Sequence, residues 1–212
     1  MNINVKEIFS LYDPKLDGWL DIYQTAFPLN EQMLVSSLIR AIRENDPSEH
    51  FLAVSEEGKD EVIGMFHFKL VNADTAMSGE SPVILYLLYL AVSPDKRNKG
   101  LGTMIYRDWI IPAAKQYRCS AIVLEVEKPE IAMTISVKEA EMARRRIEFY
   151  RRNGARLLEG VQYIQSVGRW QPSTEMCLMI HPLIHLSPDD AYSMMKKIFH
   201  DSVKQVGNPS LT

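Results

Sequence analysis

The stretch VILYLLYLAVSPDKRNKGLGTMIYRDW, residues 83–109, decides the fold. Its first part, VILYLLYLAV, is apolar at both odd and even positions, which is typical of a strand that is buried on both faces in the middle of a sheet. Its last part has apolar residues at helical spacing and predicts a helix over residues 101–117, which Pro112 should kink or end. The two parts are joined by a short cationic turn that contains Gly100 and Gly102. The turn therefore places flexible backbone and positive charge between a central strand and the start of a helix.

This turn has the properties of a phosphate-binding loop. Glycines allow the backbone to approach a ligand closely, and the first N–H groups of a helix attract anions. A dinucleotide-binding fingerprint requires a third glycine where Ile105 stands, and the P-loop pattern G-x-x-x-x-G-K-[ST] is not matched either. The pattern that remains is Arg-x-x-Gly-x-Gly, which begins at Arg97 and suits a pyrophosphate. The alternative is a plain strand-to-helix connection that happens to contain two glycines.

Strand and helix patterns alternate along the rest of the chain. We expect strands over residues 3–11, 120–127, 156–165 and 175–181, a hairpin over residues 50–71, and helices over residues 17–27, 30–45, 138–152 and from Ser187 to about Val206. This order predicts the α/β class, with one mixed sheet flanked by helices. Residues 1–182 are expected to form the main domain, and residues 183–212 a helical extension of it that ends in a loose tail. The extension should cap the sheet or support a homodimer.

The bulk properties argue against several classes of function. The 212 residues fit one domain with a full core, and the formal net charge of −3 gives no general attraction to nucleic acid. The apolar run at residues 83–92 is too short for a membrane helix, and residues 1–10 have no signal-peptide pattern. Neither the cysteines nor the histidines follow a metal-ligating spacing. We therefore expect a cytoplasmic protein with reduced cysteines, without a metal, and without nucleic-acid or membrane partners.

In three places the sequence resembles the GNAT superfamily of acetyl-CoA-dependent N-acetyltransferases. The most specific is LAVSPDKRNKGLGTMIY, residues 90–106, and two others support it: RIEFYRRNGARLL, residues 146–158, and IVLEVE, residues 122–127. The resemblance extends over residues 3–182 in the order of the elements. It implies a central mixed, mostly antiparallel, splayed sheet of about six to seven strands with helices on both faces. It also implies that acetyl-CoA is the co-substrate and that an amine is the acceptor.

The resemblance assigns a cofactor site to the end of the central strand and to the turn. The backbone of Leu90, Ala91 and Val92 would pair with the pantetheine arm as if with another strand. Backbone N–H groups of the turn would bind the pyrophosphate, and they belong to Asn98, Lys99, Gly100, Leu101, Gly102 and Thr103. The side chains of Arg97 and Lys99 would add positive charge near the phosphates.

Transfer of an acetyl group to an amine requires a proton acceptor, a stabilised oxyanion and a proton for the leaving thiolate. Tyr150 matches the family tyrosine that lies near the sulfur and acts as the acid. The alternative for Tyr150 is a helix aromatic that packs beside Phe149. A backbone N–H near Val92 would polarise the thioester carbonyl.

The resemblance leaves the identity of the base open. Glu125 stands where some family members carry a catalytic glutamate, and Glu127 points to the same side of the strand. Two carboxylates on one side can raise the pKa of one of them, which suits a base; the alternative is that both pair with arginines of the next helix. Glu31, between the first two helices, is a further candidate, and its alternative role is that of a helix-start carboxylate. Many family members need only water as the base.

Two positions depart from the family pattern. Family members often have asparagine seven residues before the tyrosine and a small residue four before it, whereas Ala143 and Arg146 stand here. The segment 128–142 is also longer than usual and is expected to reshape the acceptor pocket. The arginines of this helix would face the CoA phosphates or an acidic acceptor, or else form a solvated surface.

Together these expectations describe an N-acetyltransferase that transfers an acetyl group from acetyl-CoA to a primary amine by direct attack. The acceptor is expected to be a small molecule or a peptide, because fold and cofactor motif do not fix the second substrate. The alternative is a catalytically inactive acyl-CoA-binding sensor or interaction module.

Overall fold

The computed structural model describes residues 2–72, 83–166 and 172–212. The strands are β1 (Ile3–Glu7), β2 (Glu49–Glu56), β3 (Val62–Asn72), β4 (Val83–Val92), β5 (Ala121–Glu127), β6 (Arg156–Gln165), β7 (Thr174–Pro182) and β8 (Val203–Leu211). The α-helices are α1 (Leu16–Ala26), α2 (Val35–Glu44), α3 (Leu101–Ile105), α4 (Ile111–Gln116), α5 (Pro129–Met133), α6 (Val137–Arg152) and α7 (Pro188–Phe199). Short helical turns are η1 (Leu29–Glu31), η2 (Pro94–Lys96), η3 (Tyr106–Ile110, of π type) and η4 (His200–Ser202).

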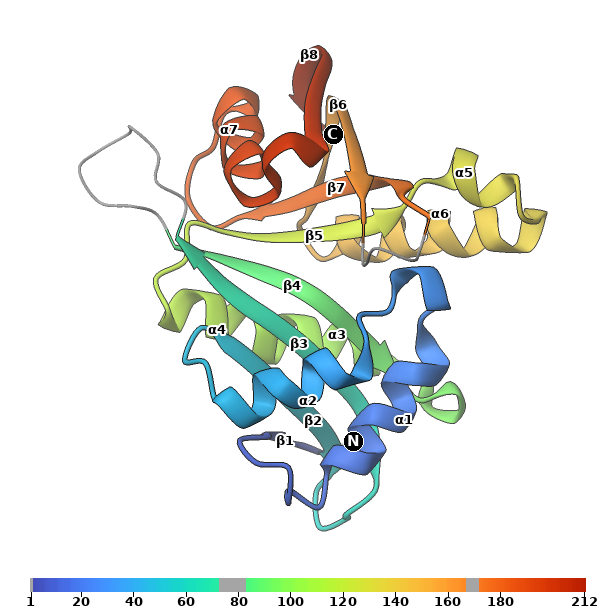
Figure 1. Ribbon diagram of the computed structural model, residues 1–212, viewed down its shortest axis with the longest axis vertical. Helices are drawn as coiled ribbons and strands as arrows, with labels where there is room; N and C mark the ends of the chain where they lie inside the picture. The colour runs from blue at the N-terminus through green and yellow to red at the C-terminus, as the bar shows by residue number, and fades with distance from the viewer. Residues whose placement is uncertain (1, 73–82, 167–171) are drawn as a thin grey trace. The chain divides into compact units, whose positions relative to one another are not determined.

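The strands form one open sheet of eight strands in the order β1-β2-β3-β4-β5-β7-β6-β8, flanked by helices (Figure 1). The pairs β1–β2, β2–β3, β5–β7, β6–β7 and β6–β8 are all antiparallel. The predicted mixed α/β class is therefore confirmed, with eight strands instead of the six to seven that we expected.

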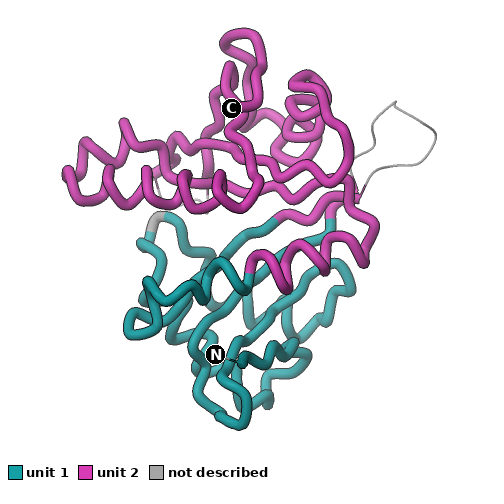
Figure 2. Tube along the Cα trace, turned by 180° about the vertical axis from the view of Figure 1, so that it is seen from behind, with its two compact units in different colours: residues 1–70, 87–105, 167–171 teal, residues 71–86, 106–166, 172–212 magenta. Residues whose placement is uncertain are grey.

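The chain divides into two compact units, which are described separately (Figure 2). Among the described residues, unit 1 comprises residues 2–70 and 87–105, and unit 2 comprises residues 71–72, 83–86, 106–166 and 172–212. The expected division of the chain at residue 182 stays a prediction.

In unit 1, α1 and α2 pack against β2 and β3, in front of which they lie in Figure 1. The apolar residues of α1 recur every three or four positions, so Leu16, Trp19, Ile22 and Tyr23 fall on one face and become buried. The Trp19 and Tyr23 rings stack with centroids 5.5 Å apart. This aromatic layer fixes the helices to the face of the strands that carries Phe51.

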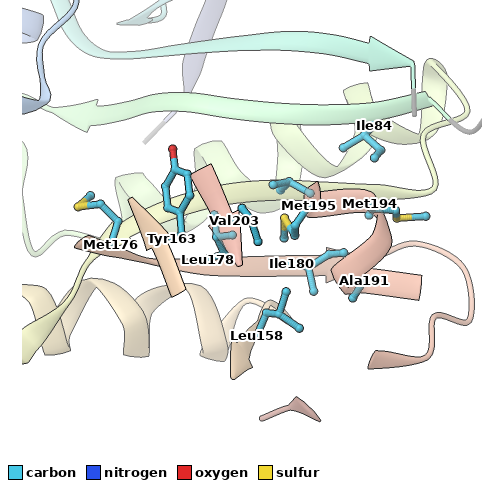
Figure 3. Packing of buried hydrophobic residues seen from close by; sticks show 12 residues of the cluster. Ile84, Leu158, Tyr163, Met176, Leu178, Ile180, Ala191, Met194, Met195 and Val203 are labelled. Carbon is cyan, nitrogen blue, oxygen red and sulfur yellow. The ribbon is translucent and has the colours of Figure 1, made fainter. Parts of the chain in front are cut away.

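In unit 2, α7 covers a cluster of buried side chains from β5, β6, β7 and β8 (Figure 3). Its start is fixed by a capping box, in which the Ser187 hydroxyl accepts from the Asp190 N–H and Asp190 accepts in return from the Ser187 N–H. Met194 and Met195 then point from α7 into the cluster, beside Ile180. The predicted helix start at Ser187 is therefore confirmed.

The C-terminus differs from the prediction. α7 ends at Phe199, where a helix to about Val206 was expected. Residues 203–211, which we expected to be the end of this helix followed by a loose tail, form β8 and pair with β6. Gly160 lies at φ 76° where the register of this pair shifts, and a Cβ there would lie 2.3 Å from the Asn208 carbonyl oxygen. Backbone pairing, rather than apolar patterning, holds these last residues.

The helix after the glycine turn is interrupted as Pro112 predicts. Residues 101–105 are α-helical, residues 106–110 form a π turn, and the α-helix resumes at Ile111. Proline has no N–H to donate to the preceding turn, so the hydrogen-bond ladder widens just before it.

The long segment 128–142 contains a short helix, α5, that the sequence analysis missed. α5 packs on the first half of α6 through Ala132, Ala140 and Ala143, all of which are buried. Small side chains allow two helices to approach closely, which accounts for alanine at position 143. Of the helices in the described residues, none is long and apolar enough to cross a membrane.

Candidate active site

The glycine turn adopts the backbone that its sequence predicts. Asn98 has φ 60° and Gly100 has φ 81°, the left-handed region that asparagine and glycine enter most readily. A Cβ on Gly100 would meet no atom within 4 Å, so glycine is needed here for its left-handed backbone angle and not because a side chain would clash. α3 begins at Leu101, and the first N–H groups of a helix have no acceptor within the helix. The N–H groups of Leu101, Gly102 and Thr103 are thus left for an external acceptor.

Two basic side chains form hydrogen bonds to the backbone beside this turn. The Arg97 Nε donates to the Val92 carbonyl oxygen at 3.0 Å, and the Lys99 Nζ donates to the Asp95 carbonyl oxygen at 2.9 Å. Both side chains are exposed, so the rest of each cationic group faces solvent. Arg97 and Lys99 therefore shape the turn in addition to placing positive charge beside it.

The residues predicted to pair with pantetheine form the end of β4. Ala91 is buried, whereas Leu90 and Val92 are half-buried. Gly64 on β3 lies beside them: a Cβ there would be 3.2 Å from the Ala91 carbonyl oxygen and 3.3 Å from the Ile105 Cδ1. Glycine at this position allows β3 to lie close to both the predicted pantetheine strand and the helix that follows the turn.

Tyr150 lies in the last turn of α6 and is half-buried. Its ring is 5.6 Å from that of Tyr106 and 4.9 Å from that of Phe149, centroid to centroid. Burial raises the pKa of Tyr150 to about 12, so the phenol keeps its proton at neutral pH. Within the described residues no hydrogen bond is formed by its hydroxyl. The phenol is thus a proton donor without an internal acceptor in this part of the chain.

Side-chain contacts fix the end of α6 that carries Tyr150. The Arg107 Nε donates to the Asn153 Oδ1 at 2.8 Å, and the Asn153 Nδ2 donates to the Phe149 carbonyl oxygen at 2.7 Å. Gly154 follows at φ 98°, and a Cβ there would lie 2.9 Å from the His181 Cε1. The expected helix end at Gly154 is confirmed, and the close approach of His181 adds a second reason for glycine.

Glu125 lies on β5 in a network of uncharged donors. Its carboxylate accepts hydrogen bonds from the Tyr86 hydroxyl and from the Gln165 Nε2, and a third from Tyr163. Tyr86 and Tyr163 both pack against Phe199 of α7, with ring centroids 5.3 and 4.7 Å away. Burial raises the pKa of Glu125, and the three hydrogen bonds oppose that shift because they favour the ionised form.

Tyr150 and Glu125 lie on opposite faces of the strands of unit 2. Ile180 of β7 belongs to the cluster under α7, and the next residue, His181, points to the other face because successive strand residues alternate. The His181 ring lies 5.8 Å from that of Tyr106, which packs against Tyr150. Glu125, by contrast, belongs to the face that α7 covers.

The other candidate bases differ from Glu125 in their surroundings. Glu127 forms an ion pair with Arg146 of α6, as the alternative interpretation proposed. Glu31 lies in unit 1, where its backbone carbonyl accepts from the Tyr89 hydroxyl at 3.0 Å. Of the two strand carboxylates, therefore, only Glu125 has no cationic partner within the described residues.

The sequence analysis missed Tyr86, Tyr163 and Gln165. Tyr86 lies in the apolar run 83–92 and was counted only as part of a buried strand. A phenol inside such a run is nevertheless a signal, because a buried tyrosine hydroxyl usually has a hydrogen-bond partner. Tyr163 and Gln165 carry no comparable signal, because only the strand pairing brings them to Glu125.

The predicted site residues thus fall into two groups. The turn and the end of β4 lie in unit 1, whereas Tyr150 and Glu125 lie in unit 2. Within the described residues, no group of three or more histidine, cysteine or acidic side chains is placed to hold a metal ion.

Comparisons with known proteins point to one family. The family model described as "Acetyltransferase (GNAT) family" matches residues 16–154. No match was found among curated proteins. A GNAT-family protein from Bacteroides thetaiotaomicron has a similar structure, with TM-score 0.66 and 22% identity, over 92% of this chain and 98% of the other.

Two further solved structures show the same fold. Arabidopsis thaliana NAA60 in complex with acetyl-CoA has TM-score 0.62 and 15% identity, over 86% of this chain and 99% of the other. The ribosomal-protein-S18-alanine N-acetyltransferase from Escherichia coli has TM-score 0.53 and 17% identity, over 87% of this chain and 96% of the other.

Proposed function

Since the chain belongs to the acetyltransferase (GNAT) family and is an acyltransferase, we propose that it transfers an acetyl group from acetyl-CoA to a primary amine. The acceptor is the amine of a small molecule or peptide, which attacks the thioester directly without an acyl-enzyme intermediate. The observation that carries this proposal is the turn after β4, where Asn98 and Gly100 take left-handed angles just before a helix begins.

Acetyl-CoA binds along the end of β4 and at the turn. The N–H groups of residues 98–103 bind the pyrophosphate, because those of Leu101, Gly102 and Thr103 have no acceptor within α3 and the start of a helix carries partial positive charge. Arg97 and Lys99 add charge, and the backbone of residues 90–92 pairs with the pantetheine arm. The solved relatives with bound acetyl-CoA support this assignment at the level of the fold.

The proton steps are divided between Glu125 and Tyr150. Glu125 takes a proton from the acceptor ammonium, and the freed amine nitrogen forms a bond to the thioester carbonyl carbon. A backbone N–H near Val92 stabilises the resulting oxyanion. The nitrogen of the resulting intermediate loses its second proton to solvent, the carbon–sulfur bond breaks, and Tyr150 donates its proton to the thiolate.

The opposite placement of the two residues in unit 2 suits this division. The attacking nitrogen and the departing sulfur occupy different positions around the carbonyl carbon, so the base and the acid are needed in different places. Overall, an ammonium and a thioester become an amide, a thiol and one released proton. The Tyr150 phenolate then takes a proton from solvent, and the Glu125 carboxyl gives its proton to solvent, so both side chains return to their starting forms.

A thermal-shift titration with acetyl-CoA tests the cofactor assignment, with NAD and ATP as controls. A ligand that binds only the folded state at 100 times its Kd adds about 2.7 kcal/mol, which corresponds to an increase in Tm of about 5–10 °C for a chain of this size. A saturable increase with acetyl-CoA alone supports the proposal, whereas no increase removes its main support.

The variant Tyr150→Phe then tests catalysis. Loss of a positioned general acid lowers kcat by about 100-fold or more while the Kd for acetyl-CoA stays within about twofold. Unchanged kcat would contradict the assignment of Tyr150 as the acid. Wild-type protein that binds acetyl-CoA but acetylates no amine of a broad panel would favour the sensor alternative.

We also propose that the protein is cytoplasmic. Cys119 and Cys177 are both free thiols, and reduced cysteines are typical of that compartment. A fractionation that recovers the protein in an oxidising compartment would contradict this location.

A further inference from the structure

The turn after β4 has a backbone conformation that needs support from its surroundings. Asn98 and Gly100 both lie in the left-handed region, and a residue other than glycine stays there only where neighbouring contacts fix it. The side chains of Ser93, Arg97 and Lys99 form hydrogen bonds to residues that are two, five and four positions away. These short-range contacts shape the turn, but they do not connect it to the distant parts of the fold.

A fourth side chain makes that connection. The Lys96 Nζ, in η2, donates to the Glu56 Oε1 at 2.8 Å, and Glu56 is the last residue of β2, 40 positions earlier in the chain. Among the side-chain hydrogen bonds that residues 93–100 form with the described part of the chain, this is the only one to a residue more than five positions away. β2 and the turn both belong to unit 1, which is teal in Figure 2. The Glu56–Lys96 pair thus joins the turn to the sheet within one compact unit.

This pair is more sheltered than most surface ion pairs. The side chains of Lys96 and Glu56 are 19% and 17% exposed. Lys59, in the hairpin that follows β2, donates to the other oxygen of the same carboxylate. Hydrogen bonds from Lys59 and Lys96 lower the pKa of Glu56 to about 2, so the carboxylate is ionised at every pH at which acetyl transfer is assayed.

The three cations of the turn therefore have different surroundings. The charge of Lys96 is balanced by Glu56, and Asp95 lies 4.0 Å from the same ammonium group. Arg97 and Lys99 donate to uncharged carbonyl oxygens, and neither forms an ion pair within the described residues. One cation thus supports the turn, and two keep their charge for an anion.

We propose that Glu56 is a positioning residue of the acetyl-CoA site, which acts through Lys96 to hold the turn in the conformation that binds the pyrophosphate. No contact between Glu56 and the cofactor is required. The inference rests on the proposed function and adds to it an acidic residue that lies outside the turn motif.

The sign of the effect separates positioning from simple electrostatics. Acetyl-CoA is anionic, so removal of a nearby negative charge would strengthen its binding if the turn stayed as it is. Loss of positioning acts in the opposite direction, because the apparent affinity falls with the fraction of molecules that have the binding conformation. Glu56→Gln should therefore raise the Kd for acetyl-CoA by about threefold to tenfold in calorimetric titrations of the whole protein.

Glu57→Gln is the matched control. It removes the same charge at the next residue, and the exposed Glu57 carboxylate accepts a hydrogen bond from the Asn2 Nδ2 instead of from the turn. Its Kd for acetyl-CoA should equal the wild-type value or lie slightly below it. Thermal unfolding of each variant verifies that it is folded.

Lys96→Gln and the double variant Glu56→Gln/Lys96→Gln complete a double-mutant cycle. If Glu56 acts through Lys96, its replacement has no further effect once Lys96 is gone. The double variant should therefore bind acetyl-CoA no more weakly than Lys96→Gln alone. Additive losses of affinity in the double variant would contradict the assigned role.

Two further readouts distinguish positioning from a general loss of stability. In Glu56→Gln the KM for acetyl-CoA should rise, whereas kcat at saturating acetyl-CoA should stay within about twofold of wild type. The second readout needs no ligand: the Lys96 and Arg97 amides, which donate to carbonyl oxygens of η2 and its cap, should exchange their hydrogens about threefold faster or more. Exchange of the amides that pair β2 with β3 should not change.

The outcomes separate this inference from the proposed function. A folded Glu56→Gln protein that binds acetyl-CoA as tightly as wild type, or more tightly, overturns the inference, and so does an equal loss of affinity in Glu57→Gln. The proposed function fails if wild type binds no acetyl-CoA. Amide exchange then still tests the contact: unchanged exchange in Glu56→Gln overturns the support of the turn by Glu56, and faster exchange supports it while the proposed function is contradicted.

Discussion

Removal of the Tyr86 hydroxyl should shift the pH dependence of acetyl transfer in a defined direction. In Tyr86→Phe the ionised Glu125 carboxylate loses one of its three hydrogen bonds, whereas the protonated carboxyl loses much less stabilisation from the same change. The ionised form is therefore destabilised, and the pKa of Glu125 in the folded protein rises further. Because the proposed base must be ionised to accept a proton from the ammonium, the acid limb of kcat/KM should move to higher pH.

The size of the shift follows from the strength of the hydrogen bond. A hydrogen bond to a charged group contributes about 1.5–3 kcal/mol, and one pKa unit corresponds to about 1.4 kcal/mol. The acid limb should therefore move upward by about one to two pH units. Well above the raised pKa, the activity of Tyr86→Phe should approach that of wild type.

The assay is the pH profile of kcat/KM, because its limbs report the groups that titrate in the free enzyme and free substrate. The acceptor should be an alkyl amine whose own pKa lies well above the range studied. Tyr192→Phe on α7 is the control, since within the described residues no hydrogen bond joins Tyr192 to Glu125. An unmoved acid limb in a folded Tyr86→Phe protein would refute the reasoning, and so would an equal shift in Tyr192→Phe.

Two other changes test the turn and the end of the chain. Gly100→Val forces a β-branched residue to φ 81°, so it should lower the free energy of unfolding by about 1–3 kcal/mol and weaken acetyl-CoA binding in titrations. The control is Gly58→Val, at φ 74° in the β2–β3 hairpin. It should lower the free energy of unfolding by a similar amount and leave acetyl-CoA binding unchanged. Ser187→Ala removes the cap of α7 and should lower the free energy of unfolding by about 1 kcal/mol in urea denaturation without changing the Kd for acetyl-CoA. A Gly100→Val protein with wild-type affinity, or a Ser187→Ala protein with wild-type stability, would contradict these expectations.

The elements that the sequence predicts are those whose signals are local. β4 is recognised from its continuous apolar run, the turn from Gly100 and its basic neighbours, and α7 from the Ser187 cap. Each signal lies within about ten residues and reflects burial, backbone angle or capping, which short segments determine. The kink near Pro112 was predictable for the same reason.

The elements that the sequence does not predict depend on distant partners. β8 has the sequence VKQVGNPSL and is mostly exposed, so it shows neither apolar alternation nor a continuous apolar run. It is a strand because β6 offers it an edge for pairing, and nothing within its own residues reveals that edge. The helix α5 is only five residues long, which is too short for a periodic pattern.

The candidate site was predictable only in its parts. The turn and Tyr150 stand within motifs, and the sequence places Glu125 on a strand. The partners of Glu125 stand 39 residues before it and 40 residues after it, on β4 and β6. Which side chains meet a given strand residue depends on strand order and register, and a shift by one residue would turn each of them to the other face.

Glu125 and Glu127 have the same place in the strand pattern but different surroundings in the structure. Alternation predicts that both point to one side of β5, where either their mutual repulsion would raise the pKa of one of them or both would pair with arginines. Glu127, however, is the last residue of the strand, where Arg146 of α6 reaches its carboxylate and neutralises it. Glu125 lies two residues further inside, between strands that supply only phenols and an amide, and burial rather than repulsion raises its pKa. The position of the strand end, which no pattern in the sequence specifies, thus decides which of the two neighbouring carboxylates has no cationic partner within the described residues.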